Sequence, residues 1–319
     1  MPVTKVGSKW NEEGAEGQLT FYRKDTGEPV FSITEEGVQF PNPTGAQDYF
    51  VDLNVSASGN GLSWATAFAT IAEAITASNT SIGLTANRWG ARRNRIFVCG
   101  DGITENLTVL PEKTDIIGVG SDLFPFPRII GNHAFAVAKV GVRFINLGFF
   151  TATTADLMSF PTSCHGLQIL GCYMHPATTS SKAIEITSSA HVRIEGNTIT
   201  VGAGAMANIF ALAISIEGTV CHDIHITNNK ITATLGISVV EAAAAAMGSI
   251  IEGNTIRSTG IAIDDNSDDF QVVNNRWMTD VDTTTSTAGY DFNLQLAAGN
   301  IQMGVTGLCD SVPFVKIAE

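Results

Sequence analysis

One short motif recurs along the middle of this chain. Residues 191–199, HVRIEGNTI, return as residues 223–231, DIHITNNKI, and the core of the motif returns again at residues 251–256, IEGNTI. Two looser copies, at residues 167–174 and 270–277, fit the same frame. The copies are anchored, at steps of 25, 32, 25 and 21 residues, on Cys172, Asn197, Asn229, Asn254 and Asn275. Self-similarity near this period indicates a solenoid in which one repeat is one coil.

A second short strand is predicted between successive anchors. Residues 183–186, 213–216, 236–239 and 260–263 alternate between apolar and small or polar side chains, which is the pattern of a half-buried strand. No crossover helix fits between the strands, which argues against a βαβ unit. We therefore predict an all-β fold, a parallel β-helix with like strands stacked about 4.8 Å apart. Isoleucines should stack inside, and one corner should carry a ladder of Asn197, Asn229, Asn254 and Asn275, each amide bonding the coils above and below.

The pattern resembles the right-handed parallel β-helix superfamily, the pectate-lyase-like fold, over roughly residues 49–290. This resemblance implies a fold and leaves the activity open, because one scaffold carries many functions. We expect three parts: an N-terminal β-rich attachment or oligomerisation segment at residues 1–45, the β-helix at residues 46–290, and a C-terminal cap at residues 291–319. Within the second part, residues 46–80 should form an N-terminal cap.

The segment before the solenoid reads as short strands. Residues 18–23, 29–33 and 38–40 alternate as strands, and residues 41–45, PNPTG, form a linker. Three short strands bury little surface alone, so we expect the segment to pack on its own solenoid, on sister subunits or on another protein.

A strand, a glycine-rich loop and a helix are predicted next. The strand covers residues 48–55 and the helix residues 66–75, with Ser63 as its N-cap. This helix would cover the open end of the first coil. The first coils should then contain strands at residues 95–99, 107–110, 115–119, 128–131 and 142–147.

The charge and the cysteine content of the chain limit the classes of partner and ligand that we expect. The net charge is -13 with only 15% charged residues, and the pI is about 4.8, so neither nucleic acid nor an anionic membrane is an expected partner. The five cysteines, at positions 99, 164, 172, 221 and 309, form no CxxC pair, and we expect buried, reduced thiols rather than zinc ligands. Cys164 and Cys221 share an offset two coils apart, too far for a disulfide. The first residues, MPVTK, do not read as a signal peptide.

The strongest candidate for chemistry is an acidic run after the strand at residues 260–263. It consists of Asp264, Asp265, Asn266, Ser267, Asp268 and Asp269. Paired carboxylates serve as acid and base in glycosidases, and aspartates hold Ca²⁺ in β-helix lyases. However, the repeat predicts Thr187, Glu217 and Val240 at the matching positions of neighbouring coils, and these make no carboxylate constellation. An ordinary solvated turn is therefore the preferred interpretation. No catalytic, cofactor-binding or metal-binding residue is predicted, no cofactor is expected, and Ca²⁺ binding by the run is left open.

Histidines and asparagines have structural interpretations. His165 and His222 share an offset two coils apart, while His191 and His225 sit at others. Without convergent carboxylates this is no acid–base or metal set. The asparagine column is explained by a buried amide stack.

Three functions remain open at this point. The first is a non-enzymatic structural protein of a virus particle, since residues 17–22, 26–28 and 31–33 resemble β-modules that begin some phage head-decoration and tail-fibre proteins. The resemblance implies a virion location after assembly in the host cytoplasm, a homotrimer, and docking through residues 1–45 onto a major capsid or tail protein, with host glycans as further partners. The second is a glycan-degrading enzyme, a tailspike-type depolymerase or polysaccharide lyase, marked by carboxylates and aromatics in an outward groove. The third, a bacterial adhesin, fits less well without a signal peptide.

Overall fold

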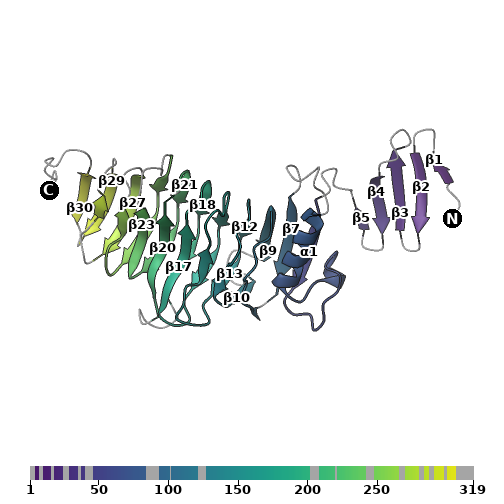
Figure 1. The fold of residues 1–319 in the computed structure, drawn as a ribbon, viewed down its shortest axis with the longest axis horizontal. Helices are drawn as coiled ribbons and strands as arrows, with labels where there is room; N and C mark the ends of the chain where they lie inside the picture. Colours follow the sequence, from purple (N-terminus) through teal and green to yellow (C-terminus); the bar gives the residue numbers. More distant parts are fainter. Residues whose placement is uncertain are drawn as a thin grey trace.

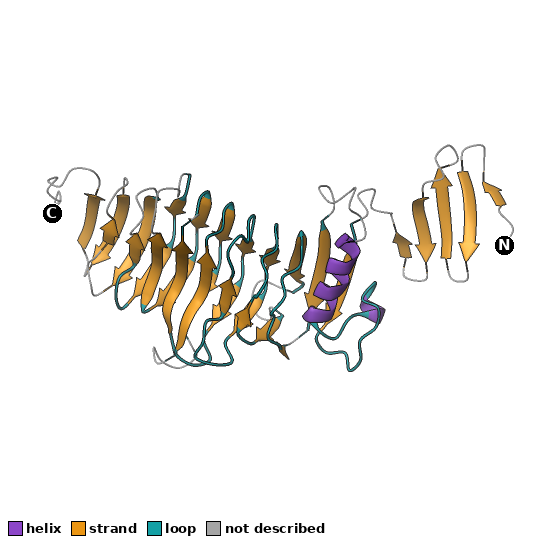
Figure 2. Cartoon of the chain, viewed as in Figure 1, coloured by secondary structure: helices purple, strands orange, loops and turns teal. Residues whose placement is uncertain are grey.

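The computed structural model of this 319-residue chain describes most of the molecule. The described residues are 4–6, 10–15, 18–23, 29–34, 37–39, 46–83, 93–100, 102–120, 127–201, 208–219, 221–241, 248–265, 270–279, 284–286, 291–297 and 300–306. They are mostly strands, with one α-helix near the start of the solenoid (Figure 2). The strands lie one above the next along the long axis of the molecule (Figure 1).

Each regular coil holds three strands, so the solenoid has three stacks of parallel strands. One coil shows the plan: β15 (Gln168–Leu170), β16 (Tyr173–His175) and β17 (Ser180–Thr187). We call the stacks through these strands the first, second and third stack. Parallel registers join each strand to its counterparts one coil away, as when Ile169 pairs with Ile194 and Ile184 with Ile214. These long parallel sheets confirm the predicted parallel β-helix.

The first stack consists of β6 (Asp48–Asp52), β7 (Asn94–Cys99), β9 (Thr114–Gly118), β12 (Arg143–Ile145), β15, β18 (Val192–Glu195), β21 (Ile224–Thr227), β24 (Ile250–Glu252) and the start of β27 (Gln271–Thr279). The second consists of β8 (Ile103–Thr104), β10 (Arg128–Ile130), β13 (Gly148–Phe150), β16, β19 (Thr198–Ile199), β22 (Lys230–Ala233), β25 (Thr255–Ser258), the end of β27 and β29 (Asp291–Ala297). The third consists of β11 (His133–Ala134), β14 (Met158–Phe160), β17, β20 (Phe210–Gly218), β23 (Leu235–Glu241), β26 (Ile263–Asp265) and β28 (Thr284–Ser286).

The corner between the first and second stacks holds the predicted asparagine ladder. The Asn229 side chain accepts the Asn197 backbone N–H at 2.9 Å and donates to the Ile194 carbonyl at 2.9 Å. Asn254 and Asn275 repeat this pattern coil by coil, and all four ladder asparagines are buried. The residue before each anchor has a positive φ, between 54° and 67°, at Gly171, Gly196, Asn228, Gly253 and Asn274. Glycine and asparagine tolerate this left-handed bend best, which explains the recurring Gly-Asn and Asn-Asn pairs.

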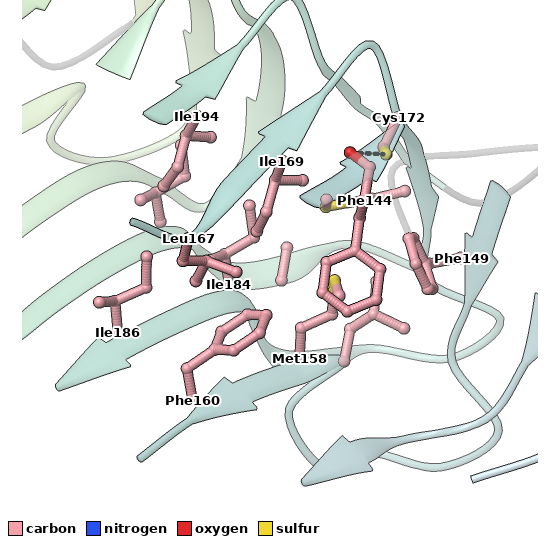
Figure 3. Packing of buried hydrophobic residues seen from close by; sticks show 14 of the residues in the cluster. Phe144, Phe149, Met158, Phe160, Leu167, Ile169, Cys172, Ile184, Ile186 and Ile194 are labelled. Carbon is pink, nitrogen blue, oxygen red and sulfur yellow. Dashed lines mark hydrogen bonds between the residues drawn. The ribbon is translucent and has the colours of Figure 1, made fainter. Parts of the chain in front are cut away.

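The interior is continuous and apolar. Isoleucines at equivalent positions of the first stack, Ile169, Ile194, Ile226 and Ile251, are fully buried, as predicted. Towards the N-terminus the same space is filled by Phe144, Phe149 and Phe160 (Figure 3). Cys164, Cys172 and Cys221 are buried free thiols, while Cys99 is half-buried and free. Cys309 lies outside the described residues.

The N-terminal cap is a helix, but its start differs from the prediction. Ser63 precedes the short η1 (Trp64–Thr66) and makes no capping hydrogen bond. The α-helix α1 (Ile71–Gly83) begins later, because Thr70 and Glu73 exchange hydrogen bonds between side chain and backbone N–H, at 3.3 and 3.2 Å. The Glu105 carboxylate also accepts the N–H groups of Ile71 and Ala72, at 3.1 and 2.9 Å. The Glu105 carboxylate, which follows β8, thus fixes the start of α1.

Three other strand predictions need correction. Residues 107–110 are not a strand; Leu107 and Leu110 are buried in irregular chain, and the strand of this coil is β8. The strand predicted at residues 260–263 begins only at Ile263. The N-terminal segment forms five strands rather than three.

That N-terminal segment is an antiparallel sheet. It contains β1 (Thr4–Val6), β2 (Trp10–Ala15), β3 (Gln18–Arg23), β4 (Pro29–Thr34) and β5 (Gly37–Gln39), paired in chain order. At the other end, β30 (Asn300–Thr306) pairs antiparallel with β29 and so reverses the direction of the parallel stack. No helix among the described residues is long and apolar enough to cross a membrane.

Candidate functional site

The third stack determines where the predicted acidic run lies. Asp264 pairs with Ser238 of β23, and Ser238 pairs with Ser215 of β20, which in turn pairs with Glu185 of β17. The expected match of Asp264 with Val240, Glu217 and Thr187 is therefore wrong by two residues. The number of residues between the ladder asparagine and the third stack varies from coil to coil, so counting from the asparagine misplaces this register.

The run itself is split between the outside and the inside of the solenoid. Asp264 is half-buried on the outer face, while Asp265 is 1% exposed and pairs with the buried Val239. Side chains alternate across a strand, so consecutive aspartates cannot face the same side. Asn266, Ser267, Asp268 and Asp269 lie outside the described residues.

A cluster around Lys182 occupies the outer face of the third stack. The Lys182 ammonium donates to Glu185, and to the Glu217 Oε1 at 2.5 Å. The Ser159 hydroxyl donates to Glu185 at 2.6 Å, and the Ser215 hydroxyl donates to Glu217 at 2.7 Å. Thus two carboxylates from neighbouring coils share one ammonium group. We call Lys182, Glu185 and Glu217 the lysine–glutamate cluster.

The electrostatics of this cluster favour the ionised forms of Lys182 and Glu217. Burial by itself would lower the Lys182 pKa, but the hydrogen bonds to Glu185 and Glu217 raise it overall. The hydrogen bond from Lys182, helped by the one from Ser215, lowers the pKa of Glu217. A general acid in glycoside hydrolysis needs a carboxyl whose pKa is raised, so that it carries a proton at neutral pH. Glu217 has the opposite shift, and the cluster is arranged as an ion pair that joins two coils.

A histidine–aspartate cluster lies at the corner before the first stack. Asp223 accepts hydrogen bonds from His191 Nδ1 at 2.6 Å and from His225 Nε2 at 3.0 Å. The His222 ring meets the His191 ring edge-on, with 5.2 Å between centroids. The bond from His191, together with the bond from His225, lowers the Asp223 pKa. The three hydrogen-bonded groups are substantially exposed, since the side chains of His191, Asp223 and His225 are 62%, 47% and 41% exposed.

Sequence reasoning missed the histidine–aspartate cluster. His191 and Asp223 both lie six positions before their ladder asparagines, Asn197 and Asn229, so the register was available in the repeat. The error was to compare histidines only with histidines. The Asp223 carboxylate, which binds both His191 and His225, comes from the coil after that of His191.

Aromatic side chains gather on the outer face of the second stack. Phe150 lies 5.9 Å from Tyr173 and 5.1 Å from His175, measured between ring centroids, and all three are half-buried. Burial lowers the His175 pKa. These rings are on β13 and β16, whereas the lysine–glutamate cluster is on β17 and β20. The aromatics and the paired carboxylates therefore belong to different stacks.

Thiol and metal chemistry find little support in the described part of the chain. Burial raises the pKa of Cys164 to about 11 and that of Cys172 to about 12, so both thiols are protonated at neutral pH. Within the described ranges, no group of three or more His, Cys, Asp or Glu side chains is placed to hold a metal ion.

Comparisons with protein-family models, curated proteins and solved structures find no significant match to this chain. The functional argument therefore depends on the geometry described above.

Proposed function

We propose that this chain is a non-enzymatic structural protein of a virus particle, a phage capsid-decoration or fibre-like protein of the pectate-lyase-like superfamily. Residues 1–45 would attach it to a major capsid or tail protein, and the solenoid would stand exposed on the particle. One observation carries this proposal: the chain combines a small antiparallel sheet with a long parallel solenoid, and the two share no strand pairing among the described residues.

The solenoid suits an exposed, load-carrying role. Every coil is hydrogen-bonded to its neighbours through parallel strands, and the ladder adds buried bonds at one corner. Opening one coil would break these bonds on both sides, so local unfolding and proteolysis should be slow. In this proposal the partners are copies of the same chain in a homotrimer, the capsid or tail protein, and host glycans. Neither nucleic acid nor membrane is among the partners.

A five-stranded sheet is too small to be stable on surface burial alone, which supports a docking role for residues 1–45. The test uses particles that lack this protein. Full-length chain should co-sediment with such particles, and a chain of residues 46–319 should not, although its circular dichroism and thermal unfolding should stay those of a folded solenoid. A full-length Thr227→Lys variant, changed on the solenoid surface, should still attach. Attachment of residues 46–319 would overturn the proposal.

The alternative is a glycan-degrading enzyme, and one observation favours it: Glu185 and Glu217 of neighbouring coils face the same side. The Lys182 ammonium shared by both carboxylates weighs against it, and the lowered pKa of Glu217 excludes that residue as the general acid. The test is release of reducing ends from purified host capsular polysaccharide. Cleavage that is lost in Glu185→Gln and Glu217→Gln, with Glu252→Gln as the active control, would establish the enzyme. Absence of cleavage by the wild type would remove it.

A further inference from the structure

The outer face of the first stack changes character along the solenoid. One outward column runs Phe50, Phe97, Ile117, Ile145 and Leu170, in consecutive registered strands. The same column then continues with Glu195, Thr227 and Glu252. The backbone is the same in both halves, so only the side chains distinguish the apolar half from the polar half. We call the five apolar residues the apolar stripe.

The stripe faces outward and is partly exposed. Its members alternate with core residues that are fully buried, such as Val51, Ile96 and Ile116, and each stripe residue is half-buried instead. Phe50 and Phe97 stack with 5.7 Å between ring centroids, and the 42% exposed Trp64 meets Phe50 edge-on at 4.9 Å. Five coils at about 4.8 Å each extend the stripe over roughly 20 Å. A continuous apolar surface of this kind marks an interaction site.

Charge decides which partner fits. Beside the stripe runs a second column, Asp48, Arg95, Asp115 and Arg143, in which the sign alternates from coil to coil and Asp115 is buried, at 7% exposure. Arg95 binds Asp48 through two hydrogen bonds of 2.8 and 2.7 Å. Arg93 Nη1 lies 3.1 Å and Arg143 Nε 3.7 Å from Asp115 Oδ1. This face therefore holds three arginines against two aspartates, in a chain whose net charge is -13.

Two copies of so acidic a chain repel one another on most approaches. They can meet through a face that carries no excess of negative charge. The arginines of this face can then meet acidic side chains of the other copy, which a net charge of -13 supplies in excess.

We propose that the apolar stripe and its charged column form the contact between copies of this chain. The proposal rests on the self-association included in the proposed function and assigns it to one face of the solenoid. Apolar side chains would be buried at the centre of the contact, with ion pairs beside them, as in other interfaces between subunits. The polar continuation through Glu195, Thr227 and Glu252 would remain in solvent.

The test measures the molar mass of purified full-length chain by size-exclusion chromatography with light scattering, over a range of micromolar concentrations. The wild type should be oligomeric. The double variant Ile117→Lys and Ile145→Lys should dissociate, with affinity weaker by roughly 100-fold or more. Thr227→Lys, the same change of charge on the same face beyond the stripe, should leave the oligomer intact. A milder Ile145→Thr variant should weaken association while unfolding like the wild type, which separates loss of contact from loss of fold.

Three results would overturn the proposal: a monomeric wild type, an oligomer that survives in the folded double variant, or an oligomer that is lost on removal of residues 1–45 alone. The last result would assign self-association to the N-terminal sheet instead. Because the test uses purified chain, its failure is distinct from failure of residues 1–45 to attach to the particle.

Discussion

The coils before and after Cys172 share the same stacked strand arrangement but differ in the side chains that fill their interior and corner. In the later coils the corner column is asparagine and the first-stack core is isoleucine, with each side chain placed on its equivalent. In the coil directly before Cys172, which contains β12, β13 and β14, the corner position is Leu147 and the core is filled by Phe144, Phe149 and Phe160. The later coils are therefore tied by repeated buried hydrogen bonds, and the coil before them by aromatic packing.

Cys172 lies at the boundary between these two regions. Its backbone N–H donates to Asn197 Oδ1 at 2.8 Å, as a ladder residue does, but its thiol makes only weak hydrogen bonds, to the carbonyls of Leu170 at 3.5 Å and Phe144 at 3.6 Å (Figure 3). The comparison teaches that the backbone of a β-helix does not require one kind of core. It requires that each coil fill its interior and satisfy its corner.

The largest effect should come from breaking the ladder in its middle. Asn229→Ala would leave the Asn197 N–H, one Asn197 amide hydrogen and the Ile194 carbonyl without their partner in a buried corner. Each such loss costs about 1–3 kcal/mol, so we expect the free energy of unfolding to fall by about 5 kcal/mol. Urea denaturation followed by circular dichroism measures this. A loss below about 1 kcal/mol would mean that the ladder does not stabilise the fold. The control is Thr227→Ala, because the neighbouring Asn228 has a positive φ and its substitution would strain the backbone.

A slightly smaller loss of stability is expected from a substitution among the phenylalanines of the coil before Cys172. Phe144 is fully buried and packs against Phe149, with 5.8 Å between ring centroids. Phe144→Ala should lower the free energy of unfolding by about 4 kcal/mol, because it removes apolar contacts and leaves a cavity. Phe144→Leu should recover most of that loss in the same denaturation experiment. Equal losses in both variants would contradict the view that volume is what this position supplies.

A substitution at Cys172 should extend the asparagine ladder by one coil. Cys172→Asn would place an amide where it can donate to the Phe144 carbonyl, as Asn197 donates to the Ile169 carbonyl at 2.9 Å. One added buried hydrogen bond should raise the free energy of unfolding by about 1 kcal/mol. Cys172→Ser, which is smaller and reaches less far, is the matched control. Destabilisation by the asparagine would show that the neighbouring phenylalanines leave no room for a longer ladder.

The smallest effect should be a pH dependence at the histidine–aspartate cluster. The pKa of Asp223 is lowered in the folded chain, so its ionised form stabilises the fold above the ordinary aspartate pKa of about 3.9, and this contribution is lost as pH falls through the folded pKa. Asp223 is half-exposed, so Asp223→Asn should cost only about 0.5 kcal/mol near pH 6. The difference from wild type should vanish near pH 2. Thr227→Ala, a substitution at a side chain that does not titrate, is the control, and a difference between Asp223→Asn and wild type that persists at pH 2 would contradict the assignment.

The repeat by itself determined the solenoid, the inward isoleucines and the asparagine ladder, because a side chain that must match its copy one coil away has to recur at the same place in the motif. Only the tertiary structure decided the register of the third stack, since the lengths of chain between stacks vary and each strand settles where its apolar face is buried. That register brought Lys182 between Glu185 and Glu217, and turned Asp265 inward while Asp264 stayed outside. In the coils before Cys172 the strands predicted at residues 95–99, 115–119, 128–131 and 142–147 are present, and residues 107–110 were the error, because burial of Leu107 and Leu110 in irregular chain resembles a strand in sequence.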